Sequence, residues 1–192
     1  VAAVAVSVAA VAASAAAAPP GDGDIGDNMI QRLFRHLCAF AWRTRRALPQ
    51  AALEAIEIAI EASEARHAGE LRVVVEHALH PGAILRGQTD RERAVDLFST
   101  LRIWDTEHNN GVLIYLLMAD HDIEIVVDRG IRARVPDERW AELCRQPEIR
   151  FAQGEFRDGL LQAVAAITDE LSRHFPSADA RHNELPDRVL VL

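Results

Sequence analysis

The sequence predicts an α/β domain in which a small mixed sheet of three to four strands lies between layers of helices. The run 111–119 is apolar on both alternating faces, as expected of an interior strand that is covered on both sides. A second apolar run, 123–127, follows after the short polar reversal Asp120-His121, so the two runs should pair as an antiparallel hairpin. Segments with the apolar spacing of amphipathic helices precede and follow this hairpin.

Before the hairpin, the pattern predicts a helix, a strand and a second helix. Pro49 suits the first turn of a helix with one apolar stripe and several glutamates on its outside. The β-branched segment 71–78 has the length of a buried strand. Thr89 and Glu92 have the spacing of a capping box, which marks the start of the next helix.

After the hairpin, two further helices are predicted. The first follows Pro136 and ends at Pro147, and the second runs from about residue 154 to residue 175. The α/β domain therefore spans residues 49–175. The tail 176–192 is expected to be irregular, apart from a short edge strand within its last five residues.

The first 28 residues have a different composition from the rest. Residues 1–20 are almost entirely Ala and Val, and residues 21–28 form an acidic, Gly-rich segment that suggests a linker. The Ala/Val run is similar to the apolar part of a signal peptide but lacks a positively charged start. We therefore expect translation to begin at Met29, which predicts a cytoplasmic protein that can associate peripherally with a membrane. If residues 1–20 are a signal remnant, the protein is exported instead.

Charge is distributed unevenly along the chain. The net charge is −8, with −3 in residues 1–28 and +5 in residues 29–50, which leaves −10 for residues 51–192. An acidic domain of this kind argues against a nucleic-acid partner, since nucleic-acid binding requires a basic surface. The two cysteines lack metal-ligand spacing and are expected to be buried free thiols.

The basic segment 29–48 is predicted to form an amphipathic helix. Its apolar residues fall on one helical stripe, which contains Ile30, Leu33, Phe34, Leu37, Ala41 and Trp42. Five arginines within residues 29–46 surround that stripe. Such a helix can bind a membrane protein or an anionic membrane surface, or it can pack on its own acidic domain.

An ordered set of residues resembles the TPM-domain family, whose founding members are a thylakoid-lumen phosphatase, a photosystem repair protein and a modulator of acetylcholine receptors. The set spans roughly residues 51–175 and consists of Ala94, Phe98, Trp104, the run 109–113, the run 123–125, Gly130, Phe151, Gly154 and Gly159. The sequence is most similar to short bacterial members without a membrane anchor.

This resemblance implies a three-layer, Rossmann-like sandwich. It also implies phosphatase activity and calcium binding, which are attributed to some plant members, and the membrane-associated role of many bacterial members. The chain departs from the family pattern at Asn109, where relatives often have an acidic residue. An amide at this position weakens the inference, drawn from the family resemblance, that this chain binds a metal ion here.

Polar residues gather at the two ends of the predicted hairpin. Because the start of one antiparallel strand lies beside the end of the next, Asp105 and Asp128 are expected at the same edge of the sheet. Together with Asn109 and Asn110 they would suit Ca²⁺ or another divalent cation. Asp105, Asp128 and Arg129 are the candidate catalytic residues, because a carboxylate beside an arginine can hold or attack a phosphoryl group. The alternative is a structural role, in which these side chains satisfy the turn backbone or pair with nearby arginines.

Two functions follow from these features. The first is a non-enzymatic interaction module that meets a partner protein or a membrane surface through residues 29–46. The second is a divalent-metal-dependent acid phosphatase acting on phosphomonoesters. The sequence contains no phosphate loop, dinucleotide fingerprint or nucleophile elbow, which argues against nucleotide-driven and serine-hydrolase chemistry.

Overall fold

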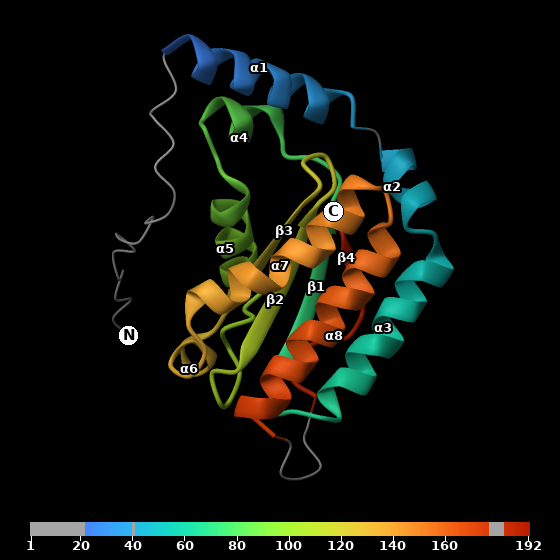
Figure 1. Ribbon diagram of the computed structural model, residues 1–192, viewed down its shortest axis with the longest axis vertical. Helices are drawn as coiled ribbons and strands as arrows, with labels where there is room; N and C mark the ends of the chain where they lie inside the picture. Colours follow the sequence, from blue (N-terminus) through green and yellow to red (C-terminus); the bar gives the residue numbers. More distant parts are fainter. Residues whose placement is uncertain (1–21, 40, 177–182) are drawn as a thin grey trace.

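The computed structural model describes residues 22–39, 41–176 and 183–192 and contains one open sheet between two layers of helices (Figure 1). The strands are β1 (Glu70–Glu76), β2 (Gly111–Leu117), β3 (Asp122–Val127) and β4 (Leu190–Val191). The helices are α1 (Asp22–Leu37), α2 (Ala41–Ala47), α3 (Gln50–Glu64), α4 (Pro81–Leu85), α5 (Asp90–Thr100), α6 (Arg129–Arg132), α7 (Asp137–Ala152) and α8 (Phe156–His174). This architecture confirms the predicted α/β class.

The sheet is mixed, with the strand order β3-β2-β1-β4. Strands β2 and β3 form the predicted antiparallel hairpin, in which Val112 lies opposite Val127. Strands β1 and β2 are parallel, and β4 adds a short parallel edge beyond β1. The carboxyl ends of β1 and β2 therefore lie at one edge of the sheet, and the start of β2 lies with the end of β3 at the other.

Each face of the sheet has its own apolar core. Helices α3, α7 and α8 cover one face, where their buried side chains meet alternate residues of β1, β2 and β3. Helices α4 and α5 cover the other face, where the fully buried Tyr115 lies among aliphatic side chains. Burial on both faces explains why β2 has no polar residue.

The predicted single helix over residues 29–48 is wrong, because the segment forms the two helices α1 and α2. Helix α1 begins at Asp22 and so includes most of the predicted linker, since extending an established helix adds one backbone hydrogen bond per residue. It ends at Leu37, and the interruption allows α1 to lie against α4 while α2 leads into α3 (Figure 1). Residues 1–20 lie outside the described part of the chain.

The predicted helix end at Pro147 is also wrong. Helix α7 continues through Pro147 to Ala152. A proline removes one helical hydrogen bond, but here both Pro147 and the following Phe151 are buried. Burial of these two side chains offsets the lost bond, and the Phe151 ring packs against Gly159 of α8.

Candidate functional site

The start of β2 and the end of β3 meet closely, as the sequence predicts. The backbone N–H of Gly130 donates to the carbonyl of Asn109 at 3.1 Å. A Cβ atom at Gly130 would lie 2.6 Å from the same carbonyl oxygen, so this position requires glycine. Asn109 and the pair Asp128-Arg129 are therefore neighbours.

Asp128 has a structural partner and one free oxygen. Its Oδ1 caps α6 by accepting from the backbone N–H of Arg129 at 2.6 Å. Its Oδ2 is buried and lacks a hydrogen bond within the described residues. Burial raises the pKa of the Asp128 carboxyl, although the hydrogen bond and the charge of Arg129 oppose this effect.

The two asparagines point to different partners. Asn109 has a left-handed backbone conformation (φ 53°), which asparagine tolerates better than most residues. The Asn109 Oδ1 atom accepts a hydrogen bond from Arg129 Nε at 2.8 Å. The Asn110 amide is buried and donates to the carbonyl of Ala68 at the start of β1. These contacts are the turn-stabilising alternative that the sequence left open.

The residues at this edge do not fit a calcium ion. Asp105 is exposed, and the guanidinium of Arg129 binds the Asn109 oxygen that a cation would need. No group of three acidic, histidine or cysteine side chains in the described part of the chain is placed to hold a metal. Calcium prefers six to eight oxygen ligands, whereas this edge offers one buried carboxylate beside a positive charge.

The opposite edge of the sheet holds a denser polar cluster, centred on Asp120 in the turn between β2 and β3. Asp120 Oδ2 accepts from Arg32 Nε at 2.8 Å and from His36 Nε2 at 3.0 Å, and its Oδ1 forms an ion pair with Arg35 Nη2 at 2.7 Å. The backbone N–H of Leu79 donates to His36 Nδ1 at 2.9 Å, which places the ring hydrogen on Nε2, toward Asp120. Three residues of α1 thus bind one carboxylate of the domain.

Hydrogen bonding outweighs desolvation at this carboxylate. Burial alone would raise the pKa of Asp120, but the hydrogen bonds and charges of His36 and Arg32 lower it to about 2. Arg32 also bonds the carboxylate of Asp90 and the carbonyl of Gln88, at 2.9 Å for the carbonyl. Asp120 is therefore ionised at neutral pH and fixes α1 to the sheet edge.

The orientation of α1 differs from that of an ordinary surface helix. Its polar residues Arg32 and His36 face the domain, together with Leu33. The remaining apolar stripe faces solvent, with Ile30, Phe34 and Leu37 exposed by 61%, 68% and 55%. The predicted apolar stripe is therefore divided, and most of it is not used for packing.

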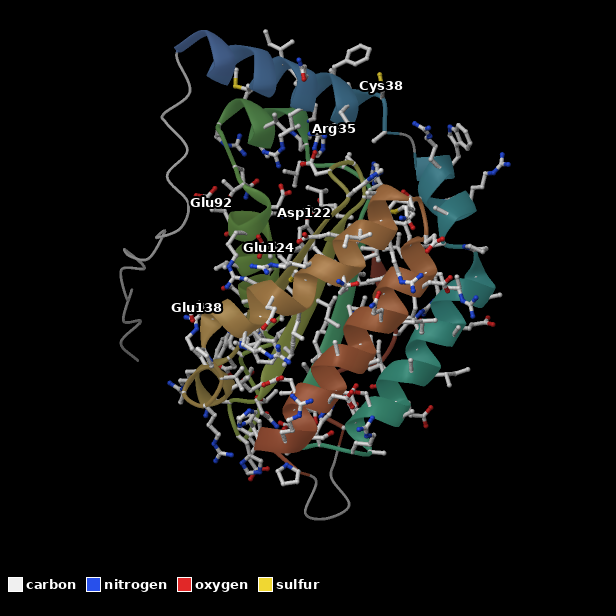
Figure 2. The ribbon with its side chains drawn as sticks, viewed as in Figure 1. Arg35, Cys38, Glu92, Asp122, Glu124 and Glu138 are labelled. Carbon is white, nitrogen blue, oxygen red and sulfur yellow. The ribbon has the colours of Figure 1, made fainter. Side chains whose placement is uncertain are left out.

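Basic side chains continue along the same surface. Arg35 lies at the end of α1 beside Cys38, as Figure 2 shows, and Arg43, Arg45 and Arg46 follow on the exposed surface of α2. Neither Arg43 nor Arg46 forms an ion pair with any described residue. We call this surface, with the exposed apolar stripe of α1 and Trp42, the α1–α2 face.

Sequence reasoning missed the role of Asp120, which was interpreted as a turn residue. Arg32 and His36 are four residues apart and therefore lie on one side of α1, opposite Ile30, Phe34 and Leu37. That second, polar stripe was the available signal. It indicates a helix that docks through polar contacts, but it does not identify the partner carboxylate.

Comparison with known proteins supports the family indicated by the sequence. The TPM domain model matches residues 44–170. The NMR structure of BA42 from the psychrophilic bacterium Bizionia argentinensis is 30% identical, with a TM-score of 0.66 over 75% of this chain and 94% of that one. The N-terminal domain of a P. gingivalis protein shares the fold at 21% identity, with a TM-score of 0.56 over 70% of this chain and 83% of that one.

The search of curated proteins gave no match. Helix α1 and the start of α2 lie outside the span of the family model. Among the helices of the described ranges, none has the length and apolarity needed to cross a bilayer.

Proposed function

Because this chain belongs to the TPM-domain family and carries α1 and the start of α2 ahead of the span that the family model matches, we propose that it is a non-enzymatic module that docks on an anionic membrane surface through the α1–α2 face. The observation that carries this proposal is the exposure of the apolar stripe of α1 beside several arginines. Helices with this combination lie in the membrane interface, with the apolar stripe buried at the headgroup boundary.

The docking of α1 supports a membrane-facing orientation. Arg32 and His36 bind Asp120, and this contact turns Ile30, Phe34 and Leu37 outward. A helix that only stabilised the fold would bury its apolar side, because burial of one such side chain contributes about 1.5–3 kcal/mol. The fold leaves this free energy available for binding.

Charge complementarity favours an anionic bilayer as the binding surface. Helices α1 and α2 together contain five arginines and three aspartates, which gives a net charge of +2, whereas residues 51–192 carry −10. A negative bilayer therefore attracts the α1–α2 face and repels the rest of the domain, which fixes the orientation of approach. Trp42, which is 59% exposed on α2, adds an aromatic side chain suited to the headgroup region.

Vesicle sedimentation tests this proposal. The full chain should sediment with phosphatidylglycerol vesicles, stay in solution with phosphatidylcholine vesicles, and lose binding as salt increases. Ile30→Asp should weaken binding by about tenfold or more. Ile58→Asp is the matched control, because Ile58 is equally exposed (66%) on α3 and lies outside the α1–α2 face.

Three results would overturn the proposal. These are no binding to either vesicle, equal effects of the two aspartate substitutions, and self-association of the chain that accounts for all sedimentation. The last result would indicate that the α1–α2 face binds the acidic surface of another copy.

The alternative function, a calcium-dependent acid phosphatase acting through Asp105 and Asp128, has weaker support. One observation favours it, namely the buried and unpartnered Oδ2 of Asp128. The exposed position of Asp105 and the guanidinium of Arg129 argue against it. Hydrolysis of p-nitrophenyl phosphate by the wild type and by Asp128→Asn, with and without calcium, tests this alternative.

A further inference from the structure

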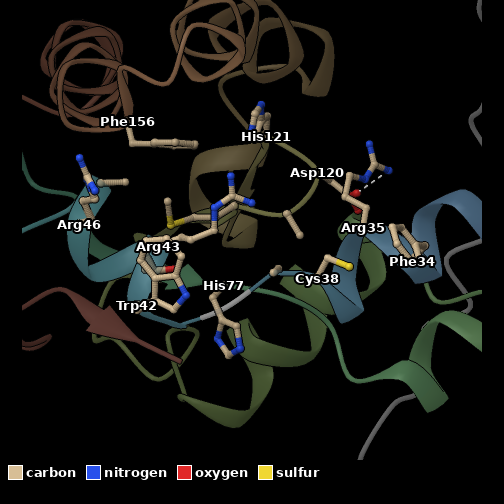
Figure 3. A pocket seen from close by; sticks show the side chains of 15 residues that line it. Phe34, Arg35, Cys38, Trp42, Arg43, Arg46, His77, Asp120, His121 and Phe156 are labelled. Atoms are coloured by element: carbon tan, nitrogen blue, oxygen red, sulfur yellow. Dashed lines mark ion pairs between the residues drawn. The ribbon is translucent and has the colours of Figure 1, made fainter.

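A cavity of about 860 Å³ lies between the α1–α2 face and the edge of the sheet where β1 and β2 end (Figure 3). Its floor is formed by His77, which follows β1, and by residues 118–121, which follow β2. Open α/β sheets characteristically bind ligands outside the carboxyl ends of their parallel strands. The volume is within the range of small-molecule sites.

The charges around this cavity are predominantly positive. Arg35, Arg43 and Arg46 line it, and Asp120 is the one acidic residue among the lining side chains. The carboxylate of Asp120 is already bound by basic residues of α1, so it does not neutralise the arginines of α2. Figure 3 shows Arg43 reaching from α2 into the space near His121 and Phe156. The guanidinium of Arg43, which has no ionic partner among the described residues, is suited to a phosphate group.

The remaining walls are largely apolar. Met118 and Phe156 are less than a tenth exposed, and Trp42 lies beside them at the cavity. The ring of His121 packs edge-on against Phe156 at a centroid distance of 5.3 Å. Burial and the nearby charge of Arg35 lower the pKa of His121, so this ring is neutral at pH 7 and adds no positive charge. A small inorganic anion would leave these walls in contact with water.

We infer that this cavity binds a single molecule that joins a phosphate group to an apolar chain, with the phosphate held by Arg43 and the chain against Met118 and Phe156. The choice of a phospholipid as that molecule rests on the proposed membrane function. The phosphate-plus-apolar chemistry rests on the cavity alone. The site lies at the sheet edge opposite to Asp128 and uses residues of α1 and α2 as its roof.

Isothermal titration calorimetry with dihexanoyl phosphatidic acid, kept below its micelle concentration, tests this inference. The full chain should bind this lipid at least about tenfold more tightly than glycerol 3-phosphate, which lacks the chains, and than dihexanoyl phosphatidylcholine, which lacks net charge. Absent binding, or equal affinity for either comparison ligand, would overturn the inference.

Two kinds of variant locate the site. Arg43→Gln should weaken binding of the phosphatidic acid by about tenfold, whereas Arg45→Gln, on the same helix but outside the cavity lining, should not. Ala119→Phe fills the cavity from the sheet side without altering α2 and should also abolish binding. Equal effects of Arg45→Gln and Arg43→Gln, or unchanged binding by Ala119→Phe, would contradict this location.

Comparison with vesicle sedimentation separates the two proposals. Binding of the monomeric lipid without vesicle binding rejects the membrane function and retains the cavity ligand. Vesicle binding without binding of the monomeric lipid retains the membrane function and rejects the cavity ligand.

Discussion

Replacing Asp120 by asparagine should destabilise the docking of α1. The three basic partners of this carboxylate lose its negative charge, while the side chain keeps its size. The pKa of Asp120 falls from an ordinary value of 3.8 to about 2 in the folded protein. Because each pKa unit corresponds to about 1.36 kcal/mol, the ionised carboxylate contributes about 2 kcal/mol to stability at pH 7. The side chain is only 9% exposed, so solvent screens little of this contribution.

The stabilisation by Asp120 should depend on pH in a direction set by its pKa shift. The folded-state pKa lies below the unfolded one, so the stabilisation is fully present above about pH 4 and is lost as the pH falls through about 2. Urea unfolding from pH 7 to pH 3 should therefore show a constant difference of about 2 kcal/mol in unfolding free energy between wild type and Asp120→Asn above pH 5. That difference should narrow in acid. Hydrogen exchange at the amides of α1 should increase in the same variant.

Asp169→Asn is the matched control for this measurement. Asp169 pairs with Arg66 at 2.9 Å, and both side chains are more than half exposed. An exposed pair of this kind contributes about 0–1 kcal/mol. If the two aspartate substitutions cost the same, or if exchange within α1 is unchanged in Asp120→Asn, the polar docking of α1 is refuted.

Three further predictions concern the fold itself. Burial lowers the pKa of His67 from 6.5 to about 4. Protonation of this residue should therefore reduce the free energy of unfolding by about 3 kcal/mol as the pH falls from 6.5 to 4. In His67→Gln, the free energy from urea unfolding should depend less on pH over this range. Gly111→Ala should lower the free energy of unfolding in urea by several kcal/mol, because the new Cβ atom would lie 2.0 Å from the carbonyl oxygen of Ile103. An unchanged urea midpoint would contradict this close approach. A thiol reagent should modify one cysteine per folded chain, the partly exposed Cys38. Cys144 should not react, because burial raises the pKa of its thiol to about 12. Modification of both thiols in the native protein would contradict this prediction.

The sequence was sufficient to predict the central hairpin. An uninterrupted apolar run, a two-residue polar reversal and a second apolar run leave few arrangements other than adjacent antiparallel strands. The capping box could likewise be identified from the sequence. In the structure, Thr89 Oγ1 accepts from the backbone N–H of Glu92 at 3.1 Å, and the Glu92 side chain accepts from the backbone N–H of Thr89 at 2.9 Å. These features depend on residues close in sequence, which is why pattern alone identified them.

Features that depend on tertiary contacts were less accessible. The short helix α4 could not be predicted from the sequence, because its five residues are too few to show a helical period. Val95 is exposed although it shares an apolar spacing with Phe98, since Ala94 and Leu97 face the core instead. The meeting of Asn109 with Asp128 and Arg129 followed from the hairpin, whereas the cluster at Asp120 joins residues more than 80 positions apart and has no local signature.

The most direct test of the proposed orientation is tryptophan quenching by brominated lipids. Trp42 lies on the α1–α2 face, whereas Trp104 is also exposed but precedes β2 at the opposite edge of the sheet. Anionic vesicles that contain dibromo phosphatidylcholine should quench the fluorescence of Trp104→Phe, which retains Trp42 and the buried Trp140. They should leave that of Trp42→Phe, which retains Trp104 and Trp140, nearly unchanged. Equal quenching of the two variants, or stronger quenching of Trp42→Phe, would contradict docking through the α1–α2 face.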